Sequence, residues 1–466
     1  LFIIANNDFN SLKEIVFKQR GCMFNVEKRV IASGSYYVGE KKSIVLQAFL
    51  GTCVGVAMYD SDANAGGLIH LLLPKPVIPE NTYEPEKYAL TALPIFLEAL
   101  YNHGAEKRKL KAIIAGGALV CPITEQDLRF DIGGQTLEIV KKILADEGIE
   151  IENSETGGFL PSKFSLDMRN WECTIELSVY DKSPKDSKLN RPDPKDIGRV
   201  MERIQPIPQV VMKVLRMIGE DAYDFKDIAN DIRNDQVICA RTLKVCNSVL
   251  YAKVKKIDSI DHALVFLGQE LFAKSVISSY IKDLLQHHSQ GYSLCMGGIY
   301  HHAVGTAIIT EKLARLTQRI SPSLAYTAGL LHDIGKVVLD QYISSALPLF
   351  YKELENEVDF LELEKKHLGF NHTEVGSQLA EKWSFPESLV DTILNHHYPE
   401  NGTQHPELTH MVYIADFLMS KFHAGLELEH MNTDNFVSRF EKIGLSVSQF
   451  QDIVDLIPAN ISESSP

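Results

Sequence analysis

The chain has 466 residues, of which 45% are hydrophobic, and a formal net charge of −14 at pH 7. This length exceeds what a single hydrophobic core usually supports, so we expect two or three domains. The acidic excess, most of it after residue 200, excludes general binding to the phosphates of nucleic acid. Seven scattered cysteines without a CxxC pair, and the lack of a long apolar run or a basic start, favour a cytoplasmic protein without disulfides, signal peptide or membrane insertion.

Residues 50–74, LGTCVGVAMYDSDANAGGLIHLLLP, predict a β-hairpin. A small-residue turn at residues 51–52 delivers Cys53 into an apolar strand, and a Gly-Gly turn at residues 66–67 starts a second strand that carries His70. An imidazole activates a thiol by taking its proton or by pairing with the thiolate as a cation. The pair is therefore a candidate catalytic dyad, and the alternative is a buried structural cysteine beside a core histidine.

The rest of the N-terminal sequence alternates strand-like apolar runs with helical stretches at residues 90–107 and 136–148, which indicates mixed α and β structure. Residues 181–196, DKSPKDSKLNRPDPKD, are rich in charge and proline and predict a linker. Beyond them nearly every segment has a helical period. We therefore expect an α+β domain over residues 1–180 and an all-α domain over residues 197–466.

Four motifs of the N-terminal domain follow one another in a fixed order. They are IASGSYYVGEKKSIVLQAFLGTCVGVAMYDSDANAGGLIHLLLP, KAIIAGGALV, DIGGQTLEIVKKILADEGIEI and TGGFLPSKFSLDM. Over residues 30–180 these motifs resemble the chemoreceptor glutamine deamidase family, CheD. The resemblance implies a sandwich of sheet and helices that hydrolyses a glutamine side-chain amide of a receptor to glutamate and ammonia, without a cofactor.

The same resemblance implies roles for individual residues. In the family the cysteine of an L-G-[ST]-C motif is the nucleophile and the histidine of G-G-x-x-H is its base, which correspond to Cys53 and His70 here. Backbone N–H groups around residues 51–54 would hold the oxyanion. The family usually carries a catalytic threonine shortly before the cysteine, where this chain has Gln47; its amide oxygen could orient the imidazole, and Ser43 is a second candidate.

Histidines are concentrated in the C-terminal half, where nine of the 16 fall within residues 301–410. Neutral imidazoles together with carboxylates suit a divalent ion such as Fe, Mn or Zn. The candidate ligands are His302, His332, Asp333, His372, His396, His397 and Asp416. The order of this set and the segment HDIGK resemble the HD superfamily of metal-dependent phosphohydrolases, in which a lysine near the phosphate corresponds to Lys336.

Residues 197–440 further resemble the HDOD family, a helical signalling module related to these hydrolases. The proline-containing start lies at Ile204–Pro208, and the pattern over Asp235–Tyr251 has Gln236 where proline is usual. Many HDOD modules have lost metal ligands and act as regulatory or docking domains, so the histidines here are either ligands or inherited structural residues. The related enzymes that hydrolyse cyclic dinucleotides carry a G-Y-P motif after the paired histidines and often a glutamate before the first histidine. This chain lacks that motif and has Gly298 at the position of the glutamate, so a cyclic-dinucleotide substrate is not supported.

Three functions remain compatible with the sequence. The first is a glutamine deamidase acting on the cytoplasmic region of a methyl-accepting chemoreceptor, with a helical domain that binds metal or partners. The second is a metal-dependent phosphohydrolase whose N-terminal domain only recruits a receptor. The third is a non-enzymatic chemotaxis adaptor, and a CheC-like phosphatase or another chemotaxis protein is a possible further partner in each case.

Overall fold

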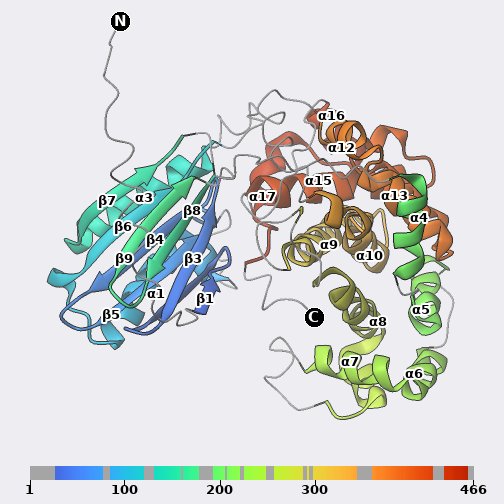
Figure 1. Ribbon diagram of the computed structural model, residues 1–466, viewed down its shortest axis with the longest axis horizontal. Coiled ribbons are helices and arrows are strands. Elements are labelled where there is room, and N and C mark those ends of the chain that lie inside the picture. Colours follow the sequence, from blue (N-terminus) through green and yellow to red (C-terminus); the bar gives the residue numbers. More distant parts are fainter. Residues whose placement is uncertain are drawn as a thin grey trace, which may run out of the picture.

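The structure is a computed structural model that describes residues 27–76, 84–119, 131–158, 161–177, 193–204, 207–220, 225–247, 257–286, 291–292, 297–343, 359–422 and 435–459. These residues form a sheet-rich N-terminal part and a helical C-terminal part, which lie against each other (Figure 1). The predicted order of an α+β domain and an all-α domain is confirmed. Residues 181–192 of the predicted linker lie outside the described residues, and residues 194–196 begin the first helix of the C-terminal part.

Two β-sheets and two α-helices make up the described N-terminal part. The four-stranded sheet has the order β1-β3-β8-β9 and the five-stranded sheet has the order β2-β5-β4-β6-β7. The strands are β1 (Glu27–Val30), β2 (Ser35–Glu40), β3 (Ile44–Leu50), β4 (Val54–Asp60), β5 (Ala65–Leu71), β6 (Lys111–Gly116), β7 (Glu150–Thr156), β8 (Ser162–Asp167) and β9 (Glu172–Leu177). The helices α1 (Ala89–Asn102) and α3 (Ile132–Glu147) pack on the five-stranded sheet.

The central strands β4 and β5 are apolar on both faces because each face is covered. Val56 and Ile69 point toward α1 and α3, whereas Ala57 and Leu68 belong to the cluster that includes the second sheet. His70 lies opposite Gly55 in the antiparallel pair and therefore shares the face toward the second sheet. Cys53 belongs to the same cluster, so the hairpin presents the thiol and the imidazole on one side.

The predicted position of the turn in this hairpin is wrong. Residues 66–67 lie inside β5, and the chain reverses at residues 61–64 instead. The reason is local: Asp60 Oδ1 accepts hydrogen bonds from the backbone N–H of Asp62 at 2.9 Å and of Ala63 at 3.1 Å, and Asn64 adopts a positive φ of 53°. The two glycines serve packing, since any side chain at residue 67 would collide with the neighbouring strand β2.

The described C-terminal part contains α-helices and short 3₁₀ turns. The α-helices are α4 (Pro194–Arg203), α5 (Gln209–Glu220), α6 (Phe225–Asn234), α7 (Gln236–Cys246), α8 (Ile260–Gln286), α9 (Gly298–Thr317), α10 (Pro322–Leu331), α12 (Phe360–Leu368), α13 (His372–Lys382), α14 (Glu387–Asn395), α15 (Pro406–Phe422), α16 (Phe436–Lys442) and α17 (Phe450–Val454). Several begin at a side-chain cap, as α4 does at Asp193 and α13 at Asn371. None of the described helices is long and apolar enough to cross a membrane.

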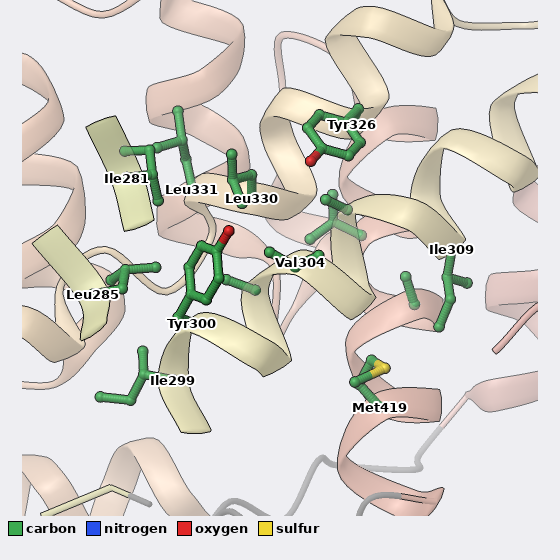
Figure 2. Packing of buried hydrophobic residues seen from close by; sticks show 14 of the residues in the cluster. Ile281, Leu285, Ile299, Tyr300, Val304, Ile309, Tyr326, Leu330, Leu331 and Met419 are labelled. Carbon is green, nitrogen blue, oxygen red and sulfur yellow. The ribbon is translucent and has the colours of Figure 1, made fainter. Parts of the chain in front are cut away.

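Helices α8, α9, α10 and α15 enclose the core of the helical part. Figure 2 shows Ile281 and Leu285 of α8 and Leu331 of α10 around Tyr300 of α9. Met419 of α15 is 1% exposed and is also part of this core. Because α15 packs along α9, its position is fixed over its whole length by buried contacts.

The two parts share buried apolar surface. One continuous cluster of buried side chains includes Ile31 and Leu72 of the N-terminal part together with Phe422 and Ile457 of the helical part. The N-terminal contribution comes from the segments next to Cys53 and His70 rather than from the faces covered by α1 and α3. The candidate thiol site therefore lies at the boundary between the parts.

Candidate functional site

Cys53 lies in a bend directly before β4 and is 1% exposed. The segment after β6 anchors this bend, because the N–H of Ala118 donates to the Gly51 carbonyl and the N–H of Gly117 donates to the Cys53 carbonyl, both at 2.8 Å. The position of the sulfur is therefore set by backbone hydrogen bonds between neighbouring strands.

His70 is oriented by a backbone carbonyl and faces a serine. Its Nδ1 lies 3.0 Å from the carbonyl oxygen of Ile31, which can only accept a hydrogen bond, so Nδ1 carries the proton. Its Nε2 lies 3.2 Å from Ser33 Oγ, and Ser33 Oγ lies 3.9 Å from Cys53 Sγ. The structure thus gathers Cys53 and His70 around the hydroxyl of Ser33.

Ser33 is the residue that the sequence interpretation missed. Gln47 lies on the face of β3 that points away from Cys53, where its amide donates to Ser165 Oγ at 3.2 Å, and Ser43 is exposed before β3. The structure brings neither to His70. The only sequence signal for Ser33 is its place beside Gly34 in the IASGS segment, and no spacing rule connects that turn with Cys53.

Both members of the pair are neutral in this buried arrangement. Burial raises the pKa of the Cys53 thiol to about 12, although hydrogen bonds with Ser33 and Thr52 act in the opposite direction. Burial also lowers the pKa of His70 to about 4 and outweighs its bond with the Ile31 carbonyl. The thiol and the imidazole are thus in the protonation states from which a base-assisted nucleophile starts.

A second cluster lies in the helical part and unites all seven predicted ligands. His302 comes from α9, His372 is the first residue of α13 and Asp416 lies within α15. The two adjacent pairs, residues 332–333 and 396–397, lie in the turns that follow α10 and α14 rather than within helices. These turns let neighbouring side chains point into one buried space from several directions.

Gly335 lets the turn after α10 approach α13 closely. A Cβ atom at residue 335 would collide with the carbonyl oxygen of His372 and would lie 2.6 Å from the backbone nitrogen of Gly376. The absence of a side chain therefore brings Asp333 next to His372. The glycine of the HDIGK segment is thereby explained by backbone packing.

Asp333 is at the centre of the cluster. Its Oδ2 lies 3.2 Å from His332 Nε2, and its Oδ1 lies 3.4 Å from His372 Nε2 and 3.6 Å from His396 Nε2. On one side, His302 Nε2 is 2.8 Å from Asp416 Oδ1. On the other, His397 Nε2 is 3.2 Å from His372 Nε2, so one chain of close contacts joins all the ligands.

The histidines are held with Nε2 toward the centre. Nδ1 of His332 lies 2.7 Å from the Gly329 carbonyl, and Nδ1 of His396 lies 2.9 Å from the Ile393 carbonyl. Nδ1 of His372 bonds Glu364 at 2.8 Å, a buried carboxylate that sequence reasoning missed because it belongs to no recognised motif. Such outer partners fix the tautomer and the ring orientation of metal-binding histidines.

The donor set fits a divalent ion. Three groups of donor atoms within 4.8 Å of one another occur among the described residues, namely His372, His396 and His397; His302, His332 and Asp416; and His332, Asp333 and His396. Within the described part of the chain, His332 Nε2, His396 Nε2 and Asp333 Oδ1 are buried and make no well-aligned hydrogen bond, although a charged or imidazole atom lies 3.2–3.6 Å from each. Buried polar atoms of this kind require either a partner or a ligand.

Electrostatics of the cluster agree with a site for a cation. Burial by itself would lower the pKa of His332, but the carboxylates of Asp333 and Asp416 outweigh it and raise that pKa to about 9. Burial would raise the pKa of Asp333, whereas His332 and Lys336 hold it well below its usual range. Lys336 Nζ lies 2.6 Å from Asp333 Oδ2 and 5.6 Å from the centroid of the Tyr292 ring, and the lysine is itself buried.

Comparisons with known proteins agree with both parts. The family CheD chemotactic sensory transduction matches residues 72–177 and the HDOD domain matches residues 204–399. A probable chemoreceptor glutamine deamidase CheD of Clostridium novyi is 43% identical over 109 residues, which are 23% of this chain and 67% of that protein. The chemoreceptor glutamine deamidase CheD of Thermotoga maritima is 37% identical over 131 residues, 28% of this chain and 80% of that protein.

A solved HDOD domain protein of unknown function from Geobacter sulfurreducens is 25% identical, with a TM-score of 0.46, and covers 56% of this chain and 95% of its own. The family matches and the curated relatives define a chemotaxis signalling protein whose helical part contains an HDOD domain over residues 204–399. The chain belongs to the CheD family of chemoreceptor glutamine deamidases, with an HDOD domain fused behind it. The CheD match starts at residue 72, so the roles of Cys53 and His70 depend on the motifs and on the geometry.

The raised pKa of His332 predicts how metal uptake depends on pH. The proton on His332 must leave before Nε2 can bind an ion, so the affinity for Mn²⁺ or Zn²⁺ should rise by up to about tenfold per pH unit from pH 6 and level off near pH 9. Isothermal titration calorimetry in two buffers should detect about one released proton per ion at pH 7.

Two variants serve as controls for this titration. Asp333→Ala should abolish stoichiometric uptake, whereas Glu374→Gln, on the same helix as His372 but paired with Lys365 outside the cluster, should retain it. Uptake that is independent of pH, or that survives Asp333→Ala, would contradict the assignment.

Proposed function

We propose that this protein is a protein-glutamine deamidase that converts glutamine side chains of a chemoreceptor to glutamate, with Cys53 as nucleophile and His70 as base. The observation that carries the proposal is the arrangement of Cys53, Ser33 and His70 within a domain of the CheD family. The partner that this function requires is the cytoplasmic region of the receptor, and the protein would act in the same compartment. A CheC-like phosphatase or another chemotaxis protein would be a further partner.

The proposed reaction uses Cys53, Ser33 and His70 once a substrate carboxamide has access to the thiol. The Cys53 thiol gives its proton to His70 Nε2 through the Ser33 hydroxyl, and Sγ forms a bond with the carboxamide carbon. The C–N bond then breaks, and His70 returns the proton to the leaving ammonia. Water hydrolyses the thioester, which releases glutamate and restores the thiol. The Nδ1–H bond to the Ile31 carbonyl keeps the ring in the tautomer that this exchange needs.

For the HDOD domain we propose that the seven-residue cluster binds one or two divalent ions such as Fe, Mn or Zn. The buried donor atoms without well-aligned hydrogen bonds support this assignment. When bound, the ion would supply Lewis-acid chemistry or a stable structural centre. The residues would hold the ion through inward-facing Nε2 atoms and carboxylate oxygens, while Glu364 and the backbone carbonyls keep the rings in place.

Deamidation changes the mass of the substrate and is directly measurable. The full chain incubated with a receptor cytoplasmic fragment should add ~1 Da for each converted glutamine, because an amide NH₂ is replaced by OH. Cys53→Ala should abolish the gain, whereas Cys173→Ala, a second free thiol of the same domain, should leave it unchanged. Equal mass gain with wild type and Cys53→Ala would refute the deamidase and favour an adaptor.

Ser33 and Gln47 offer a sharp comparison of two candidate third residues. Ser33→Ala should lower kcat by roughly 10- to 100-fold, since it removes the hydroxyl between Sγ and Nε2. Gln47→Ala should leave kcat within about twofold, because its side chain contacts Ser165 on the other face of β3 and the change is remote from the reacting atoms. A large loss of kcat in Gln47→Ala with little change in Ser33→Ala would contradict the role of Ser33 and assign the third catalytic role to Gln47, which aligns with the family threonine.

Phosphate-ester hydrolysis is the alternative function of the cluster, and Lys336 beside Asp333 is the observation that favours it. Release of nitrophenolate from bis(p-nitrophenyl) phosphate by Mn²⁺-loaded protein measures it. Turnover that is lost in Asp333→Ala and retained in Glu374→Gln would establish the activity. Metal uptake without turnover would leave the ion with a structural or regulatory role.

A further inference from the structure

The C-terminal end of α15 covers the candidate nucleophile. The Cys53 thiol donates a hydrogen bond to the carbonyl oxygen of Phe422 at 2.9 Å. The Thr52 hydroxyl donates to the preceding carbonyl, that of Lys421, at 3.5 Å. Phe422 is 2% exposed and Cys53 is 1% exposed, so solvent is excluded from both sides of the contact. The helical part therefore contacts the sulfur of Cys53 directly.

The contacts at Thr52 and Cys53 use backbone carbonyls of α15. Thr52 and Cys53 supply donors to two consecutive carbonyls in the last described turn of this helix. The group at Cys53 is a backbone amide, and its carbonyl oxygen is the atom that points at Sγ. This oxygen occupies the space in front of the thiol through which a substrate carboxamide would have to approach.

The contact also opposes activation of the thiol. The carbonyl oxygens of Lys421 and Phe422 carry partial negative charge and point at the hydroxyl and thiol groups of residues 52–53. A thiolate at Cys53 would face these partial negative charges. The closed arrangement therefore keeps Cys53 as a hydrogen-bond donor and disfavours its nucleophilic form.

A second set of contacts locks the helical part in this position. Lys87 Nζ donates to the backbone carbonyl of Asp455 at 2.5 Å, and the Tyr88 hydroxyl donates to Asp455 Oδ1 at 2.5 Å. Lys87 is fully buried, and its ammonium lies 3.8 Å from the same carboxylate oxygen. Separation of the two parts would leave this cation without its buried partners.

A third contact between the two parts is close backbone packing next to Ser33. Gly34 has a φ of +72°, and a Cβ atom there would lie only 2.7 Å from Cβ of Ala459. The turn that carries Ser33 is therefore covered by the chain that follows α17. All three contact regions surround the Cys53–Ser33–His70 arrangement.

We propose that the helical part inhibits the deamidase domain in cis, with the Phe422 carbonyl of α15 covering Cys53 and blocking access of the substrate carboxamide to the thiol. The inference rests on the proposed function. A receptor segment and α15 then compete for the same surface, and catalysis requires the helix end to leave Cys53. The helical part is thereby the element on which a signal acts to release the deamidase.

Alkylation of Cys53 in the full chain tests this closure without any substrate. Iodoacetamide labelling followed by peptide mass spectrometry gives the rate at Cys53 relative to Cys239, a half-buried thiol of α7 remote from the contact. Wild type should label Cys53 at least about tenfold more slowly than Cys239. Asp455→Ala removes the acceptor of Tyr88 and the ion-pair partner of Lys87, and should raise the Cys53 rate about tenfold.

Further variants distinguish a specific effect at the interface from general loss of structure. Asp452→Ala removes the same charge from the exposed side of α17 and should behave as wild type. Ala459→Trp places a large side chain against Gly34, where the two parts are in close contact. It should therefore raise the alkylation rate of Cys53, as Asp455→Ala does. Circular dichroism and the unchanged labelling rate of Cys239 establish that each variant is folded.

The receptor-fragment assay, run on the same samples, distinguishes failure of the closure from failure of the deamidase. Faster labelling with faster deamidation in Asp455→Ala and Ala459→Trp supports cis inhibition. If Cys53 is alkylated faster in the interface variants but no sample deamidates the fragment, α15 does cover Cys53 and the deamidase function is refuted. Rapid Cys53 labelling in wild type, or no increase in either interface variant, overturns the closure even if wild type deamidates the fragment.

Discussion

The hydrogen bond from the Cys53 thiol to the Phe422 carbonyl is the interaction on which the relation between the two domains depends. It joins the bend before β4, which carries the candidate nucleophile, to a helix that is buried along most of its length. The same helix carries Asp416 in the cluster of histidines and carboxylates. Residues 416 and 422 are separated by about 9 Å along the helix axis, so one rigid element connects the two chemical sites.

Both sites depend on buried polar groups, and the protein arranges their partners differently. Around Cys53 the donors and acceptors are satisfied by Ser33, by the carbonyl of Ile31 and by the end of α15. Burial then favours the neutral thiol and the neutral imidazole. In the HDOD domain the partners of Nδ1 are present, whereas some inward-facing atoms make no well-aligned hydrogen bond with the described residues. The polar groups of the first site are therefore hydrogen-bonded within the protein. The buried nitrogen and oxygen atoms of the second site have the chemistry that suits a bound cation.

Sequence reasoning predicted a set of candidate ligands from motifs. The structure gathers these seven side chains in one buried cluster, and only some of them lie at helix ends, since Asp416 lies within α15. Sequence reasoning failed at Ser33 and Glu364, since hydroxyl and carboxylate residues in loops and on helices are common and neither belongs to a motif. It also misplaced the hairpin turn, because the bond from Asp60 to the following N–H groups outweighs the preference of adjacent glycines for turns.

The sequence by itself determined the two domain classes, and it predicted the pair Cys53 and His70 and the residue types of the candidate metal cluster, because these follow from local pattern and from motif identity. Only the tertiary structure decided that Ser33 stands between sulfur and imidazole, that Gly335 brings Asp333 to His372, and that the Phe422 carbonyl of α15 contacts Cys53. These are contacts between segments far apart in the chain, and residues 53 and 422 are separated by 369 positions. Such contacts arise from packing of whole elements, which no local preference of the chain encodes.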